Sequence, residues 1–176
     1  MAIHFENLKK DQDEMVKKWL RQDYVSKFWY GVGLENTFKS ISRFVNGEEK
    51  LYTLWIAYDG SKPFGYLMVS KVDLEKDQFF ARHLSPTSKA ITLDLLIGDP
   101  DYLGKGLSHQ MIRELLLQKY SNMTDVLIDP GTNNSKAIHV YEKAGFKKLE
   151  EFTPDWDPSH PCILMHLKME NLKCSK

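Results

Sequence analysis

Two acidic residues stand in apolar segments, where a carboxylate could take up a proton or bind a cation. Asp94 interrupts the apolar stretch of residues 91–97, and Asp129 ends the apolar stretch of residues 126–128. A carboxylate on a buried strand costs free energy unless it is paired or has a function. Two carboxylates at the mouth of one cleft would attract and position a polyamine. Asp129 precedes a Pro-Gly pair, so capping a turn is an alternative role for it. No turn signal lies beside Asp94.

A second chemical feature is the glycine-rich turn Gly104-Lys105-Gly106, which joins a predicted strand to a predicted helix. Two glycines separated by one residue let the backbone curl with its N–H groups directed inward. The positive end of the following helix adds to them, and together they form an anion cradle suited to a pyrophosphate. Alone, Gly-x-Gly is a weak signal, because an ordinary tight turn has the same pattern. The segment continues neither as a P-loop nor as a dinucleotide-binding fingerprint.

A third feature follows after one more helix and strand. Residues 134–146 read Asn-x-x-Ala-x-x-x-Tyr-Glu-Lys-x-Gly-Phe, which closely resembles the last helix of the GNAT acetyltransferase superfamily. The glycine turn before it resembles the Arg/Gln-x-x-Gly-x-Gly/Ala loop of the same superfamily. The two motifs span about residues 91–152, and the predicted order of elements extends the resemblance over nearly the whole chain. Asp101 departs from the Arg or Gln of the loop, and we expect its side chain to face away from the phosphates.

The resemblance implies acetyl-CoA as the cofactor. Its phosphates would lie on the main-chain amides of residues 103–108, helped by Lys105. Its pantetheine arm would pair in a cleft between residues 91–97 and residues 126–129, like an inserted strand. The expected cofactor contacts are Leu96, Ile97, Leu103, Gly104, Lys105, Gly106, Leu107, Ser108, Asn134, Ala137 and Tyr141.

Within the superfamily, the chain is similar to the aminoglycoside 6′-N-acetyltransferases. The shared features are Asp94 nine residues before Leu-Gly-Lys-Gly-Leu, the segment 129–146, the aromatic segment 28–31 and the pair Gly65-Tyr66. Residues 73–89 lack the acidic character that such relatives often have there. The similarity implies a 6′-amine of an aminoglycoside as the acceptor. The implied substrate-binding residues are Trp29, Tyr66, Asp94 and Asp129.

Acetyl transfer to an amine needs a neutral nucleophile, because an ammonium has no lone pair. Asp94 is our candidate for the base that removes the proton, directly or through water. A main-chain N–H near Leu96 or Ile97 could stabilise the oxyanion. Tyr141 matches the residue that protonates or hydrogen-bonds the departing thiolate in the superfamily. The cysteines are poorly placed for an acyl-enzyme intermediate, so we expect direct transfer in a ternary complex.

Three alternatives remain open. A related small-molecule acyltransferase could acylate a hydroxylamine in siderophore assembly, although such relatives tend to have histidine at the position of Asp94. A non-catalytic module that binds coenzyme A or a peptide is disfavoured by the presence of both Tyr141 and Asp94. A protein N-terminal acetyltransferase is also possible, but the aromatic loops suggest a narrower pocket.

Composition limits the classes of partner and compartment. The 176 residues include 24 basic and 24 acidic side chains, so there is no basic excess of the kind that a nucleic-acid binder carries. Two cysteines and six histidines show neither a disulfide framework nor metal-ligand spacing. No apolar run approaches the ~20 residues that a membrane span needs, and the N-terminus does not read as a signal peptide. We therefore expect a cytoplasmic monomer or homodimer that binds no metal, nucleic acid or membrane.

The elements that would position these residues belong to an α/β (α+β) fold. Asp11 and Glu14 read as a capping box for a helix through Leu20, and a second helix carries Phe38 and Ile41. An antiparallel meander of three strands (residues 51–58, 64–72 and 91–97) follows. Helix, strand, helix and two strands complete the order, with Asn134 as helix cap and Gly145 as helix stop. Strand-helix-strand units require parallel pairing. We expect a GNAT-like mixed central sheet with splayed parallel strands and helices on both faces, in a single domain over residues 1–176.

Overall fold

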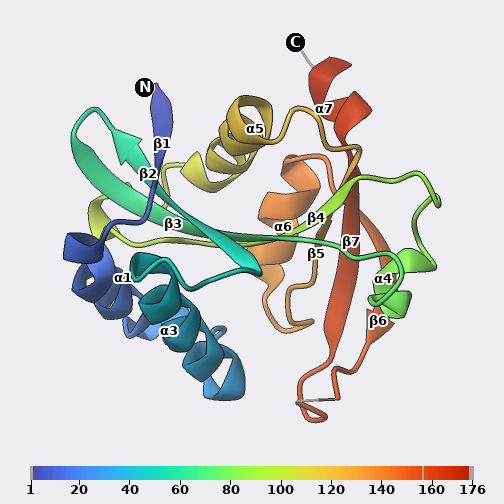
Figure 1. The fold of residues 1–176 in the computed structure, drawn as a ribbon, viewed down its shortest axis with the longest axis horizontal. Helices are drawn as coiled ribbons and strands as arrows, with labels where there is room; N and C mark the ends of the chain where they lie inside the picture. The colour runs from blue at the N-terminus through green and yellow to red at the C-terminus, as the bar shows by residue number, and fades with distance from the viewer. Residues whose placement is uncertain (1, 156, 175–176) are drawn as a thin grey trace. The chain divides into compact units, whose positions relative to one another are not determined.

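The computed structural model of the chain describes residues 2–155 and 157–174. Its strands are β1 Ile3–Asn7, β2 Tyr52–Asp59, β3 Lys62–Lys71, β4 Ala90–Ile97, β5 Asp125–Ile128, β6 Lys147–Phe152 and β7 Cys162–Lys168 (Figure 1). Its helices are η1 Lys10–Gln12, α1 Asp13–Leu20, α2 Asp23–Ser26, α3 Gly31–Val45, α4 Gln78–Ala81, η2 Pro100–Tyr102, α5 Leu107–Lys119, α6 Ser135–Lys143 and α7 Met169–Cys174. None of the described helices is long and apolar enough to span a bilayer.

The strands form one seven-stranded sheet of mixed direction, in the order β1-β2-β3-β4-β5-β7-β6. β4 and β5 pair in parallel, whereas β1 pairs antiparallel with β2, and β7 pairs antiparallel with both β5 and β6. β3 and β4 are antiparallel as well, because Gly98 N donates to Phe64 O at one end and Val72 N donates to Ala90 O at the other. The predicted mixed sheet is therefore confirmed.

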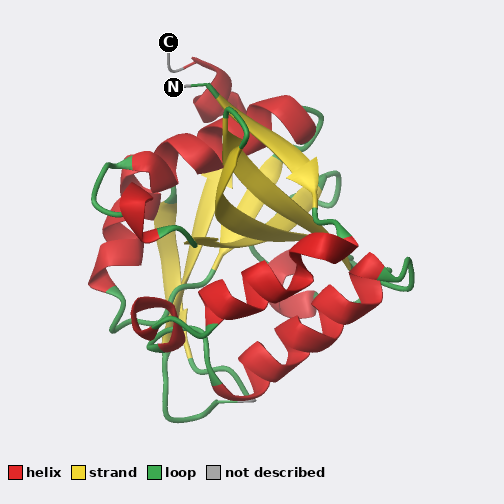
Figure 2. Ribbon diagram, turned by 90° about the vertical axis from the view of Figure 1, so that its left-hand side faces the viewer, coloured by secondary structure: helices red, strands yellow, loops and turns green. Residues whose placement is uncertain are grey.

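Contacts within the chain group the residues into two compact units. The first unit comprises Met1–Val69 and Asp94–Met111, and the second comprises Ser70–Leu93 and Ile112–Lys176. In the first unit, α1 and α3 lie side by side against one face of β2 and β3 (Figures 1 and 2). The buried side chains between them form the core of this unit: Leu8, Val16, Trp19, Leu20, Val25, Ile41, Leu54, Ile56, Tyr58, Tyr66, Met68 and Leu96.

The N-terminal part of α5, at Met111, packs on the opposite face of β3. A Cβ added to Gly65 would stand 2.5 Å from the sulfur of Met111, so the Met111 side chain occupies the space that the glycine leaves beside β3. Gly65 and Tyr66 point to opposite faces because side chains alternate along a strand. Helices therefore pack on both faces of β3, as expected.

In the second unit, α6 has a well-defined beginning and end. The side chain of Asn134 accepts a hydrogen bond from Ala137 N at 3.2 Å and caps the helix. At the other end, Gly145 N donates to Glu142 O and Phe146 N donates to Tyr141 O, which is the bonding pattern of a Schellman motif. Gly145 has a φ of 102°, a conformation that glycine adopts at little cost. Both sequence predictions for this helix are confirmed.

The predicted cap of α1 is wrong, and several short elements were not predicted. No side chain caps α1, which begins at Asp13, and the preceding turn is instead closed by Gln12, whose side chain accepts from Lys9 N. The unpredicted elements are β1, α2, α4, α7 and the two 3-10 turns η1 and η2. Of these, α4 lies within the polar excursion of residues 73–89, and α2 opens the aromatic connection between the first two helices.

Candidate active site

Asp94 lies on the face of β4 that the helices of the first unit cover. The hydroxyls of Ser70 on β3 and Thr92 on β4 are 2.7 Å apart, so these two residues share one face of the sheet. Side chains alternate in direction along each strand, and Tyr66 and Asp94 are therefore on this same face. The bonds that align β3 with β4 set Tyr66 opposite Leu96, which makes Tyr66 and Asp94 diagonal neighbours.

Asp94 is half-buried, and burial raises the pKa of its carboxyl group to about 6. The negative charge of Asp94 acts in turn on two tyrosines. Burial, and after it the Asp94 charge, raise the pKa of Tyr66 well above its ordinary value, and the same two causes raise the pKa of Tyr52. A carboxyl group that titrates near neutral pH is suited to accept a proton from a substrate.

Trp29 lies beside Tyr66 in the first unit. Its indole Nε1 donates to Thr37 Oγ1 at 2.9 Å, which fixes the ring against α3. The Trp29 ring lies 6.1 Å from the ring of Tyr66, at an angle of 44°. The structure thus brings together three of the four predicted substrate residues, Trp29, Tyr66 and Asp94.

The end of β4 is held in an irregular conformation by its neighbours. The amides of Gly98 and Asp99 both donate to Phe64 O, at 2.7 and 3.1 Å, so the strand bulges where it leaves β3. Gln22 and Tyr24 donate to the carbonyl of Gly98 at 2.7 and 3.0 Å. These two residues were not predicted as parts of the site.

The ladder between β3 and β4 also decides which amides of β4 are available. Gly98 N is directed toward β3, and amide directions alternate along a strand. The N–H of Leu96 therefore points toward β3, whereas the N–H of Ile97 points to the other edge of β4. Of the two amides expected near the reacting centre, only that of Ile97 lies outside the β3 ladder.

The glycine-rich turn adopts the conformation that its sequence requires. Gly104 and Gly106 have φ values of 71° and 69°, in the left-handed region that other residues rarely adopt. α5 begins at the next residue, so the turn leads directly into the N-terminus of a 13-residue helix. Lys105 lies over the ring of Tyr102, with its Nζ 5.4 Å from the ring centroid. The Asp101 carboxylate pairs with Lys62 Nζ at 3.1 Å.

The second unit contains the remaining predicted residues. Tyr141 is a buried residue of α6, 9% exposed, and its ring centroid lies 6.0 Å from that of Phe146. Asp129 is half-buried directly after β5. Burial, with the Asp129 charge as a further cause, raises the pKa of the Cys162 thiol to about 11. Cys162 is thus a protonated, buried thiol, and the Cys174 side chain lies outside the described part.

Residues 8–154 match the acetyltransferase (GNAT) domain family. The chain belongs to this family. It is 28% identical over 157 residues to an aminoglycoside N(6′)-acetyltransferase type 1 of Klebsiella pneumoniae, a match that covers 86% of this chain and 75% of that protein. The membership expected from the glycine turn and from the segment of α6 is confirmed.

Solved structures agree with this assignment. The chain is 39% identical to an aminoglycoside N(6′)-acetyltransferase from Legionella pneumophila subsp. pneumophila strain Philadelphia 1, with a TM-score of 0.88 over 100% of this chain and 98% of that one. The fold is also that of the aminoglycoside acetyltransferase AAC(6′)-Ib, solved with ribostamycin and coenzyme A (23% identity, TM-score 0.79, 100% and 98% covered). The chain is thus a GNAT protein that closely resembles aminoglycoside 6′-N-acetyltransferases.

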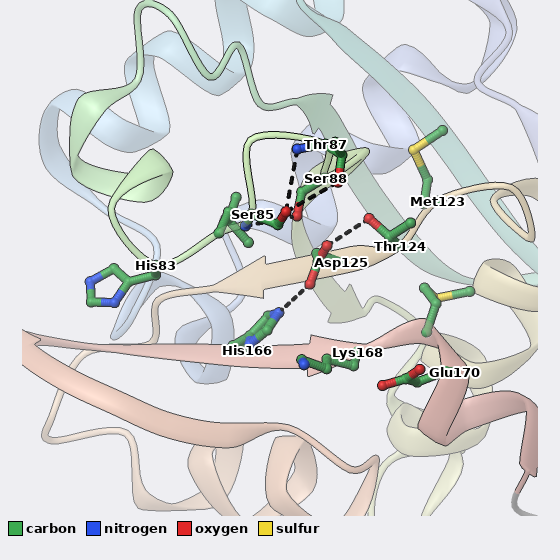
Figure 3. Close-up of a pocket in the computed structure, with 12 residues that line it drawn as sticks. His83, Ser85, Thr87, Ser88, Met123, Thr124, Asp125, His166, Lys168 and Glu170 are labelled. Atoms are coloured by element: carbon green, nitrogen blue, oxygen red, sulfur yellow. Dashed lines mark hydrogen bonds and ion pairs between the residues drawn. The ribbon is translucent and has the colours of Figure 1, made fainter.

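This GNAT chain also has a polar hollow of about 450 Å³ in its second unit, next to the beginning of β5 (Figure 3). Asp125 is one of the residues that line it and accepts from Thr124 Oγ1 at 2.6 Å and from His166 Nε2 at 2.7 Å. These bonds and one from Ser88 hold the pKa of Asp125 below its ordinary value, although burial acts in the opposite direction. Within the described residues, no group of three His, Cys, Asp or Glu side chains could hold a metal ion.

Proposed function

We propose that this protein transfers the acetyl group of acetyl-CoA to the 6′-amine of an aminoglycoside, by direct attack in a ternary complex. The observation that carries the proposal is Asp94, a half-buried carboxylate with a raised pKa on the same sheet face as Tyr66, which Trp29 contacts, in a GNAT chain 39% identical to an aminoglycoside N(6′)-acetyltransferase. We also propose that residues 1–176 act as one domain, a cytoplasmic monomer or homodimer.

The turn before α5 fits the phosphates of coenzyme A. A Cβ at Gly104 would meet no atom within 4 Å, so the left-handed backbone, rather than crowding, requires glycine there. Left-handed residues at a helix N-terminus leave main-chain amides for an anion. The pairing of Asp101 with Lys62 supports the view that Asp101 does not repel the phosphates. The residues of this turn are Leu103, Gly104, Lys105, Gly106, Leu107 and Ser108.

When bound, acetyl-CoA supplies the acetyl group as a thioester. Asp94 takes a proton from the ammonium of the substrate, which frees the nitrogen lone pair for attack. A pKa of about 6 keeps most of the Asp94 side chains ionised at neutral pH and yet leaves them basic enough to accept a proton. The Ile97 N–H, directed away from β3, is the main-chain donor for the developing oxyanion, whereas Leu96 contributes its buried side chain.

Tyr141, in the second unit, donates a hydrogen bond or its proton to the thiolate. The helix that carries it, α6, is bounded by the cap at Asn134 and by the Schellman motif. Ala137, in the first turn of α6, contacts the cofactor. A phenol suits this role because its O–H can donate to the negative charge that develops on the departing sulfur. The charge of Asp129, half-buried after β5, supports a role in binding the cationic substrate.

The proposal is tested by measuring thiol release from acetyl-CoA with a panel of acceptors. The panel contains an aminoglycoside with a 6′-amine, a matched aminoglycoside with a 6′-hydroxyl, a polyamine, a hydroxylamine and a peptide with a free N-terminus. We expect turnover with the 6′-amine and at least ~10²-fold less with the 6′-hydroxyl. Equal rates with both aminoglycosides would refute the regiochemistry. Preferred turnover of the polyamine, hydroxylamine or peptide would refute the substrate class.

A further inference from the structure

The hydroxyl group of Tyr66 is a buried donor without an acceptor. Its residue has no exposed surface, and among the described residues no group forms a hydrogen bond with this hydroxyl. A buried polar group without a partner costs free energy, and most such groups in folded proteins are satisfied by protein or by an ordered water. The ring itself is fixed between β3 and the Trp29 indole.

The Asp94 carboxylate is the matching acceptor. Burial alone accounts for its raised pKa, and no hydrogen bond or ion pair from the described residues lowers it. Glu49 is the other carboxylate whose charge acts on Tyr66. Its Oε1 accepts from Lys50 N and Leu51 N. Its Oε2 has no hydrogen bond among the described residues, but its charge is paired with Arg43 Nε at 3.2 Å. Asp94 has no such cationic partner among the described residues, and its charge acts on Tyr66 more strongly than that of Glu49, so we assign Asp94 as the acceptor for Tyr66.

Tyr66 and Asp94 share one face of the sheet, and the Tyr66 hydroxyl forms no hydrogen bond with the Asp94 carboxylate. Tyr66 and Asp94 are diagonal neighbours on one face of β3 and β4, a relation in which Cα atoms lie about 7–8 Å apart. Because the structure has no direct hydrogen bond between this donor and this acceptor, a water molecule between them would satisfy both.

We propose that Tyr66 and Asp94 hold one water molecule between them, and that this water carries the proton from the substrate ammonium to Asp94. Tyr66 is then a positioning residue. The inference rests on the proposed function, because it assumes that Asp94 is the base. It adds a role for the Tyr66 hydroxyl beyond contact with the substrate.

The protons balance in this relay. The water accepts hydrogen bonds from the Tyr66 hydroxyl and from the substrate ammonium, and it donates one to Asp94. One N–H bond of the ammonium breaks as the water takes that proton, and one O–H bond of the water breaks as Asp94 takes the other. The water is regenerated, the amine becomes neutral, and Tyr66 keeps its own proton.

The test is Tyr66→Phe, which removes the hydroxyl and keeps the ring. We expect kcat to fall about tenfold or more, with the KM for acetyl-CoA unchanged, because the phosphates are held by another part of the chain. The acidic limb of the pH–rate profile should move to higher pH, because the Asp94 carboxylate loses the water that stabilises its charge. Wild-type kcat together with a wild-type pH profile would overturn the proposal.

Tyr58→Phe is the matched control. Tyr58 is a buried tyrosine on the neighbouring strand β2, and its hydroxyl already has a protein partner in Gln12 Nε2. This variant should lose stability but keep its kcat and its pH profile per folded molecule. A loss of kcat as large as in Tyr66→Phe would show that any tyrosine of this core affects the rate, and would also overturn the proposal.

A readout without turnover separates this inference from the proposed function. The Asp94 pKa can be measured by carboxyl-carbon NMR titration of wild-type protein and Tyr66→Phe, with Asp94→Asn to assign the signal. We expect a higher pKa in Tyr66→Phe, and an identical pKa would refute the water bridge. A wild-type protein that acetylates no aminoglycoside refutes the proposed function, whatever the titration shows. A wild-type enzyme that is active, with Tyr66→Phe equally active, refutes only the role of Tyr66.

Discussion

Asp94→Asn should make the protein more stable while it removes the proposed activity. The Asp94 pKa rises from 3.8 in a solvated side chain to about 6 in the folded chain. Each pKa unit corresponds to about 1.4 kcal/mol, so the ionised carboxylate destabilises the folded state by up to about 3 kcal/mol at neutral pH. Asparagine has nearly the same shape and carries no charge, so this cost disappears in the variant.

The pH dependence has a defined sign. Below pH 3.8 Asp94 is protonated in both states, and the charge has no effect on stability. Between pH 3.8 and about 6 the unfolded chain ionises first, so the free energy of unfolding of the wild type falls relative to Asp94→Asn. Above about pH 7 the difference stays constant. The wild-type kcat/KM should also rise about tenfold between pH 5 and pH 7, because the ionised fraction of Asp94 rises from about one tenth to about nine tenths.

Urea unfolding of both proteins at pH 4.5, 6 and 7.5 measures the stability difference, and single-turnover rates on the same samples measure activity. The difference between the two proteins cancels the contribution of other carboxylates. We expect kcat/KM to fall by ~10²–10⁴ in Asp94→Asn, without the acidic limb. A variant that is less stable than the wild type at pH 7.5, with activity per folded molecule preserved, would show that Asp94 is a structural residue and refute the reasoning.

Three further substitutions test the rest of the site. Gly106→Asp should abolish coenzyme A binding in calorimetry, since it puts a side chain and a negative charge into the cradle. Gly47→Asp, at another left-handed glycine, should cost similar stability yet leave that binding intact. Tyr141→Phe should lower turnover ~10²-fold with little change in acetyl-CoA affinity, and an unchanged rate would show that water or substrate protonates the thiolate. Gly98→Ala should destabilise the fold by about 3 kcal/mol in urea unfolding, because its Cβ would stand 1.9 Å from an indole ring. Gly33→Ala is the control: a Cβ at this position of α3 would meet no atom within 4 Å, so this variant should not be destabilised.

The parts of the fold that the sequence predicts are those with a strong local signal. The hairpin of β2 and β3 turns at Gly60, whose φ of 57° suits the Asp-Gly pair in the sequence. α6 is bounded by a capping residue and by a left-handed glycine, and both could be identified in the sequence. β1 has no such signal. Its five residues alternate between buried and exposed, and it is a strand because Ile3–Asn7 pairs with residues 55–59 of β2. That pairing is a long-range contact, which periodicity does not show.

The site was predictable where it depends on motifs and unpredictable where it depends on packing. The left-handed glycines of the turn and the position of Tyr141 follow from residue types at fixed spacing. The hydrogen bonds from Gln22 and Tyr24 to the carbonyl of Gly98 could not be predicted in this way, because they join residues more than 70 positions apart in the chain. Their only sequence signal was the aromatic connection that begins near Asp23, and this signal gave no partner.

Asp94 and Tyr66 break the rule that makes the rest of this core predictable. The neighbouring positions on the same face, Leu54, Ile56, Met68 and Leu96, are apolar and buried, as a strand face under two helices requires. At Asp94 and Tyr66 the same face presents an acceptor and a donor that do not satisfy each other. Selection for stability alone would favour replacing both with apolar residues, because an unsatisfied buried pair destabilises the fold. Such local conflicts persist in proteins mainly where function requires them. This conflict supports, independently of the family motifs, the proposed proton transfer at Asp94.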